Sequence, residues 1–123
     1  MRFILIKKEI SPPFLNIEHH TLRLFDIIPK ILTSEKQLKL KLGKCINDLN
    51  LKVLNTNSNK FKGGGYTITY VLSQSSMTAH SWPEYKALHV DILTCSRIKN
   101  KNLIQKTFSN HFETQTLEYK ELE

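Results

Sequence analysis

Apolar and polar residues alternate in several short segments of this chain, as they do in half-buried β-strands. Residues 21–25 show this alternation clearly, and residues 66–72 add the β-branched and aromatic side chains that strands favour. The pattern predicts further strands over residues 51–54, 77–80, 87–94 and 114–119, with residues 3–6 as an edge strand. The polar stretch 55–62 is interpreted as a loop that leads into a turn at Gly63-Gly64-Gly65.

Two segments have helical rather than strand spacing. In residues 35–49 the apolar positions lie one helical turn apart, and they are Leu38, Leu42, Cys45, Ile46 and Leu49. Ser34, followed three residues later by Gln37, forms a capping-box pattern at the start of this segment. Residues 102–112 repeat the helical spacing. Because Cys45 lies on the apolar stripe, we expect it in the core rather than in a reactive site.

The predicted element order is β-α-β-β-β-β-α-β, with consecutive strands in the middle of the chain. This order indicates an α+β fold, a two-layer sandwich of an antiparallel β-sheet with helices packed on one face. The length of 123 residues fits one domain. We assign that domain to residues 19–123 and interpret residues 1–18 as an N-terminal extension, interrupted by Ser11-Pro12-Pro13.

Charge and composition exclude several classes of protein. The formal net charge is +7, but the lysines are scattered, which favours a solvated basic surface over a nucleic-acid interface. No apolar run reaches the roughly 18 residues of a membrane span. The first eight residues lack the pattern of a signal peptide, and the chain has two cysteines. We therefore expect a cytoplasmic protein with neither a membrane nor a nucleic-acid partner.

A serine, a histidine and a cysteine lie close together in the sequence, at Ser75, His80 and Cys95. Serine beside histidine suggests nucleophilic catalysis, although the pair also occurs by chance and no Gly-x-Ser-x-Gly elbow is present. The spacing of His80, His89 and Cys95 matches no zinc pattern, so no metal site is predicted. The residues alone indicate a Ser/His/Cys group that converges beside Trp82 and a carboxylate, that of Glu84.

The same stretch resembles the core motif of the short prokaryotic S-adenosylmethionine decarboxylase proenzymes. The matching residues are Gln74-Ser75, then Met77-Thr78-Ala79-His80-Ser81-Trp82-Pro83-Glu84-Tyr85, then Val90-Asp91-Ile92-Leu93-Thr94-Cys95. The family pattern reads Glu-Ser-His-x-x-Ile-His-Thr-Trp-Pro-Glu-Tyr, followed by Asp-x-Phe-Thr-Cys-Gly. The resemblance extends over about residues 20–112.

The resemblance implies a proenzyme that cuts itself between Gln74 and Ser75. Ser75 would become a pyruvoyl group, which forms a Schiff base with the substrate amine and accepts the electrons released by decarboxylation. His80 matches the processing proton carrier, and Cys95 matches the proton donor in catalysis. Thr67 matches a serine that supports processing. No metal is implied.

The substrate that the resemblance implies is S-adenosylmethionine, decarboxylated for spermidine biosynthesis. Phe61 and Trp82 match residues near the adenosyl group, and Glu84 matches the carboxylate expected on the ribose hydroxyls. Aromatic faces can stack on adenine and favour the cationic sulfonium. Relatives of this type form homodimers of cleaved protomers, so a homodimer is expected here.

The chain departs from the family pattern at four positions. Gln74 replaces a glutamate, Ser76 replaces a histidine, and Lys86 and Ser96 each replace a glycine. These changes leave two alternatives open within the family: a pyruvoyl-dependent decarboxylase of ornithine or arginine, and a catalytically inactive regulatory homologue. A basic nucleic-acid module is a further alternative that rests on charge alone.

Overall fold

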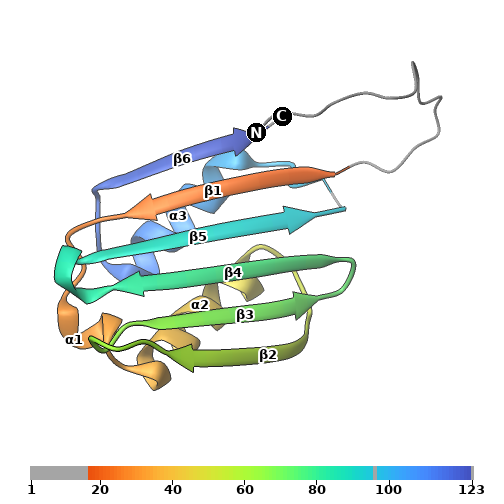
Figure 1. The fold of residues 1–123 in the computed structure, drawn as a ribbon. Helices are drawn as coiled ribbons and strands as arrows, with labels where there is room; N and C mark the ends of the chain where they lie inside the picture. The colour runs from red at the N-terminus through yellow and green to blue at the C-terminus, as the bar shows by residue number, and fades with distance from the viewer. Residues whose placement is uncertain (1–16, 96, 123) are drawn as a thin grey trace, which may run out of the picture.

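A computed structural model describes residues 17–95 and 97–122, which form one antiparallel sheet with helices on one side (Figure 1). The strands are β1 (Glu18–Leu24), β2 (Val53–Lys60), β3 (Tyr66–Leu72), β4 (Ser75–Trp82), β5 (Ala87–Thr94) and β6 (Leu117–Leu122). The helices are α1 (Pro29–Leu32), α2 (Glu35–Asp48) and α3 (Lys101–Phe112), with a 3₁₀ turn η1 (Pro83–Tyr85). This architecture confirms the predicted α+β two-layer sandwich.

The strand order across the sheet is β2-β3-β4-β5-β1-β6. Strands β2 to β5 form a meander of hairpins, in which each strand pairs with the next along the chain. β1 departs from this order, because it lies between β5 and β6 and pairs antiparallel with both. Segments from the two ends of the described chain are therefore interleaved at one side of the sheet.

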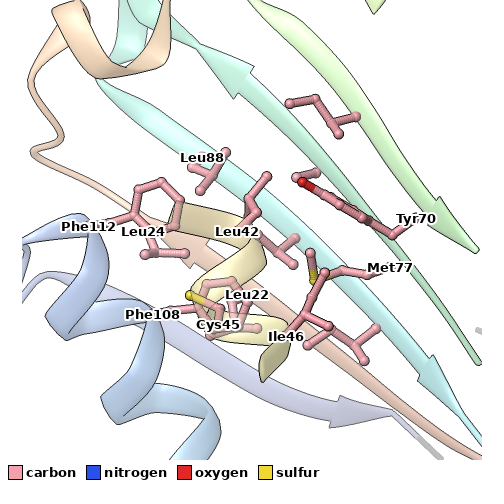
Figure 2. Packing of buried hydrophobic residues seen from close by; sticks show 14 of the residues in the cluster. Leu22, Leu24, Leu42, Cys45, Ile46, Tyr70, Met77, Leu88, Phe108 and Phe112 are labelled. Atoms are coloured by element: carbon pink, nitrogen blue, oxygen red, sulfur yellow. The ribbon is translucent and has the colours of Figure 1, made fainter. Parts of the chain in front are cut away.

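The core lies between the sheet and helices α2 and α3 (Figure 2). Each strand except β2 contributes alternate residues to it, and β5, for example, buries Leu88, Val90 and Ile92. Helix α2 contributes Cys45, which is fully buried, and burial raises the pKa of its thiol to about 12. The expectation that Cys45 belongs to the core is confirmed. In the described part of the chain no helix is both long and apolar enough to cross a membrane.

Most predicted elements are present, and the N-terminus of α2 forms as its sequence indicates. The Ser34 hydroxyl accepts a hydrogen bond from the backbone N–H of Gln37 at 3.1 Å. β3 and β5 have the predicted limits, while β1 begins three residues earlier, at Glu18. The edge strand predicted at residues 3–6, and residues 1–16 of the extension, lie outside the described residues.

The polar loop predicted over residues 55–62 is wrong for most of its length, because β2 continues to Lys60. β2 is an edge strand whose residues are nearly all exposed, and it pairs only with β3. Since neither of its faces is covered, it has no apolar alternation, which is the signal that identifies a half-buried strand. Its polar residues also protect an open sheet edge from pairing with other chains.

Candidate functional site

The two faces of the sheet differ in their side chains. One face packs on the helices, and we call the other, which no described helix covers, the open face. Antiparallel register aligns five polar residues of the open face in one line across β3, β4, β5, β1 and β6. We call this line the histidine row: Thr67, His80, His89, Arg23 and Glu118. Two residues along the strands, a second line contains Thr78, Asp91 and Thr21.

The predicted cleavage position lies in the tight turn between β3 and β4. Leu72 pairs with Ser75, so that only Ser73 and Gln74 connect the two strands. Gln74 has φ 57°, in the left-handed region that non-glycine residues seldom adopt. Ser75 is the first residue of β4 and is half-buried. The peptide bond between Gln74 and Ser75 thus joins a strained turn residue to a strand.

Cys95 lies at the same end of the sheet as Ser75. Ser75 pairs with Thr94 of β5, and Cys95 follows directly as a half-buried residue. The structure therefore brings these two residues to one end of the sheet, as the predicted roles require. Beside the turn is a groove of ≈ 650 Å³, whose lining includes Gln74 and three basic side chains, Lys52, Arg97 and Lys99.

His80 occupies a different position, between Thr67 and His89 on the open face. The Thr67 Oγ1 lies 2.8 Å from the His80 Nδ1, and the His80 and His89 rings stack with centroids 6.2 Å apart. Burial lowers the pKa of His80, the neighbouring His89 lowers it further, and Asp91 acts in the opposite direction. If the Thr67 hydroxyl accepts the Nδ1 proton, the His80 Nε2 keeps a free lone pair and can act as a base.

Ser75 and His80 are not brought together within the intact chain. Five strand positions separate them, or about 17 Å of extended backbone. Because that number is odd, their side chains also point to opposite faces: Ser75 has the orientation of buried Met77, and His80 that of exposed Trp82. The structure therefore places Ser75 and Cys95 at one end of the sheet and His80 away from both.

The predicted adenosyl residues do lie together, at the His80 end of β4. The Phe61 and Trp82 rings are stacked, with centroids 6.2 Å apart, and both remain partly exposed. Rings at this spacing contact each other with an offset, so a purine must part them or stack on an outer face. Glu84 is exposed in η1 beside the glycine turn, where a Cβ on Gly63 would lie 4.0 Å from its carboxylate.

Ser81 links three segments at this aromatic end, and no role was predicted for it from the sequence. Its hydroxyl is buried, accepts a hydrogen bond from the Tyr66 N–H and donates one to the Leu32 carbonyl, both at 2.8 Å. Gly65 packs on the same residue so closely that a Cβ there would lie 2.4 Å from the Ser81 carbonyl oxygen. Close packing thus requires a glycine at Gly65, while Gly63 and Gly64 supply the positive φ angles of 103° and 95° that the predicted turn needs.

Lys86 explains one departure from the family pattern. It has φ 52° and ends η1 in the left-handed conformation, where glycine is the least strained residue. The Lys86 side chain is exposed, so a lysine can stand here while the backbone keeps the left-handed conformation that a glycine would adopt.

A second ionisable cluster lies under the sheet, away from the histidine row. Glu18, His20 and Glu121 are the only group in residues 17–95 and 97–122 with metal-ligand spacing. Lys101 already occupies this cluster, because its ammonium donates to Glu18 at 2.7 Å. Burial raises the pKa of Glu18, but hydrogen bonds from Lys101, the Ile98 N–H and His20 outweigh it and lower the pKa to about 2. The cluster is an internal ion pair rather than a cation site.

Comparison with known proteins matches this fold and this motif. A family model described as S-adenosylmethionine decarboxylase matches residues 18–123. The S-adenosylmethionine decarboxylase proenzyme of Thermodesulfovibrio yellowstonii is 26% identical over 95 residues, which cover 77% of this chain and 70% of that protein. The arginine decarboxylase proenzyme of Ignicoccus hospitalis is 32% identical over 74 residues, covering 58% of this chain and 51% of that one.

The chain thus spans only about half the length of the arginine decarboxylase proenzymes that it matches. The crystal structure of the adenosylmethionine decarboxylase from Aquifex aeolicus has the same fold, with a TM-score of 0.77 over 89% of this chain and 90% of that one, at 16% identity. The family model covers nearly all of the described residues. The chain therefore belongs to the S-adenosylmethionine decarboxylase family.

Proposed function

We propose that this protein is a self-processing, pyruvoyl-dependent decarboxylase of S-adenosylmethionine, acting in the cytoplasm and supplying spermidine synthesis. The observation that carries the proposal is the turn at Gln74 and Ser75. A serine at the start of a strand directly follows a residue in the left-handed conformation, and Cys95 lies at the same end of the sheet. Family membership gives this arrangement its chemical meaning.

Processing begins when the Ser75 Oγ attacks the Gln74 carbonyl carbon. The serine proton moves to the amide nitrogen, and the peptide bond becomes an ester. Elimination then removes the Ser75 Cα proton and breaks the bond between its Cβ and Oγ. Gln74 is left as a free carboxylate, and hydrolysis with loss of ammonia leaves the pyruvoyl group. A left-handed residue such as Gln74 stores about 1 kcal/mol of strain, which this cut releases.

Each remaining residue has one role in the proposal. The pyruvoyl group, once formed, supplies the electron sink for decarboxylation. His80 carries protons during ester formation and elimination, with Thr67 fixing its ring through the 2.8 Å contact. Cys95 returns a proton to the substrate carbon. No metal takes part in the proposal.

The aromatic pair favours an adenosyl substrate over a free amino acid. Phe61 and Trp82 offer partly exposed faces for adenine or the sulfonium, and Glu84, exposed two residues after Trp82, would meet the ribose hydroxyls. A hollow of ≈ 260 Å³ beside them is lined by Trp82 and by His89. Arginine is the second candidate substrate, because relatives with similar identity carry that name.

We also propose a homodimer formed through the open face. Three apolar side chains on that face, Val71, Trp82 and Leu93, are between 42% and 53% exposed. Packing two open faces with their strands in opposite directions would bury Val71 and Leu93 and partly cover Trp82, and would place the His80 end of one copy over the cleavage turn of the other. The partner's His80 would then lie at the same end of the sheet as Ser75, and the strained turn at Gln74 would have to rotate the Ser75 hydroxyl towards the open face for the two to meet.

A mass spectrum of the purified protein tests the processing step. We expect two fragments separated between residues 74 and 75, and one uncut chain for Ser75→Ala. Cut protein should release carbon dioxide from carboxyl-labelled S-adenosylmethionine faster than from arginine or ornithine. An intact chain after long incubation would contradict the proposal, and faster turnover of arginine would select the second candidate.

Mixing two inactive variants tests the homodimer. A His80→Ala chain keeps its serine, and a Ser75→Ala chain keeps its histidine. Coexpression should restore cutting of the His80→Ala chain, because its partner supplies the histidine. If this chain stays uncut while light scattering shows a mixed dimer, His80 does not act between copies.

A further inference from the structure

We propose that His89 is a positioning residue for His80: its ring stacks on the His80 ring, holds it in place and opposes a second positive charge beside it. This inference rests on the proposed function, because it concerns the histidine that moves protons during processing. The family pattern quoted above does not include His89. The register of the sheet and the contacts along the histidine row support a role for it.

Register places the two histidines directly opposite each other. His80 of β4 pairs with His89 of β5. Their rings are stacked and nearly parallel, with an interplanar angle of 14° and centroids 6.2 Å apart. On its other side His80 pairs with Thr67, whose Oγ1 lies 2.8 Å from Nδ1. The imidazole is therefore held from both neighbouring strands, by a hydroxyl on one side and a ring on the other.

Charge reaches His80 along the same face. The groups that face it from β5 are His89 and Asp91, and those behind them on β1 and β6 are Arg23, His19 and Glu118, while β3 presents the uncharged Thr67. The His89 Nε2 lies 4.0 Å from the Asp91 Oδ1, which also contacts the His19 Nε2 at 3.4 Å.

The consequence of this stacking is that the two rings compete for charge. Protons on both rings would place two like charges about 6 Å apart, which is unfavourable. His80 therefore stays neutral at a lower pH than an isolated histidine would, in agreement with the lowered pKa described above. A neutral imidazole is the form that can accept the Ser75 proton.

The proton affinity of His80 can be measured without any cleavage. In the full chain carrying Ser75→Ala, the His80 ring is titrated by NMR, with His89 retained or changed to glutamine or lysine. His89→Gln removes the ring that can carry a competing charge, so the His80 midpoint should rise by up to about 0.5 pH unit, the Coulomb effect of one full charge at 6 Å in a water-like medium. His89→Lys keeps a charge and should leave the midpoint low. His111→Gln, in α3, is the matched control and should change nothing.

The processing rate supplies the second readout, in chains that keep Ser75. With His89→Gln, the pH of half-maximal cutting should rise by the same amount, so that cutting is about threefold slower on the acid side of the profile. Equal His80 midpoints in the glutamine and lysine variants would overturn the inference. If the midpoint moves as expected but the wild-type chain never cuts, the processing proposal fails and the electrostatic coupling stands.

Discussion

The covered and open faces of the same sheet follow different rules. On the covered face, strand residues such as Leu22, Val90 and Ile92 are fully buried and pack on α2 and α3. On the open face, the same strands present threonine, histidine, arginine and acidic side chains in aligned rows. The difference teaches that one alternating pattern serves two purposes, since residues of one parity build the core and those of the other, His80 among them, line up polar groups on the open face. Ser75 has the covered parity, but it stands at the end of its strand. Substitutions can break this division.

The largest effect is expected on the open face, at His80. His80→Ala should slow self-cleavage by about 10²- to 10⁴-fold, the usual contribution of a positioned proton carrier. The free energy of unfolding of the variant should differ from that of the wild type by no more than about 1 kcal/mol, because only one partly exposed hydrogen bond, to Thr67, is lost. Gel densitometry over time and urea denaturation measure the two quantities. A large loss of stability would show that the open face also supports the fold.

The covered face should respond in the opposite way at Phe108. This side chain is fully buried and stacks on Phe112. Phe108→Ala should lower the free energy of unfolding by about 3–5 kcal/mol through lost burial and a residual cavity. Leu93→Ala, on the open face, is the matched control and should cost far less. Equal losses in urea denaturation would remove the distinction between the faces.

Glu18 is an exception on the covered face, because it is charged and almost fully buried. Glu18→Gln leaves Lys101 with only the more distant carboxylate of Glu121, at 3.7 Å, and should cost about 3 kcal/mol at neutral pH. The folded-state pKa is about 2 against an ordinary value of 4.5, so this carboxylate stabilises the protein above pH 4.5 and loses that effect as the pH falls towards 2. Lowering the pH across this range should therefore lower the melting temperature of the wild type more than that of the variant, which thermal denaturation measures.

The smallest expected effect concerns the Thr67 hydroxyl in the histidine row. Thr67→Val keeps the shape of the side chain but removes the hydrogen bond to His80, and it should slow self-cleavage about fivefold. Thr67→Ser keeps the hydroxyl and is the residue type of the family, so it should cut at the wild-type rate. Equal rates for valine and serine would show that the 2.8 Å contact does not orient the ring.

Elements with one buried face were predictable from the sequence, and the others were not. β3, β5 and α2 have the expected limits within one residue, because burial imposes periods of two or 3.6 on their apolar residues. β2 has no buried face, so the strand predicted over residues 51–54 overlaps only its start and the rest was predicted as a loop. The four-residue α1 begins with proline and is too short to show a helical period.

The site divides in the same way. The motif indicated which residue types carry the chemistry, and Phe61 with Trp82 does form the expected aromatic pair. The predicted proximity of Ser75 and His80 was inferred from their closeness in sequence. Both residues lie in β4, and an extended strand separates residues five positions apart by more than a folded loop would. His89 was recognisable only through the register of β4 and β5, which follows from the hairpin and not from the motif.

The interleaved strand order has a consequence for folding after cleavage. A cut between residues 74 and 75 leaves β1 on one fragment and its neighbours β5 and β6 on the other, while β3 and β4 remain paired across the cut. The fragments would thus stay assembled, held by a sheet that neither contains alone. Unfolding would release two molecules instead of one, so the refolding of processed protein would become second-order and depend on concentration. The uncut chain would fold in a unimolecular reaction, whereas the two fragments would have to find each other before they could refold.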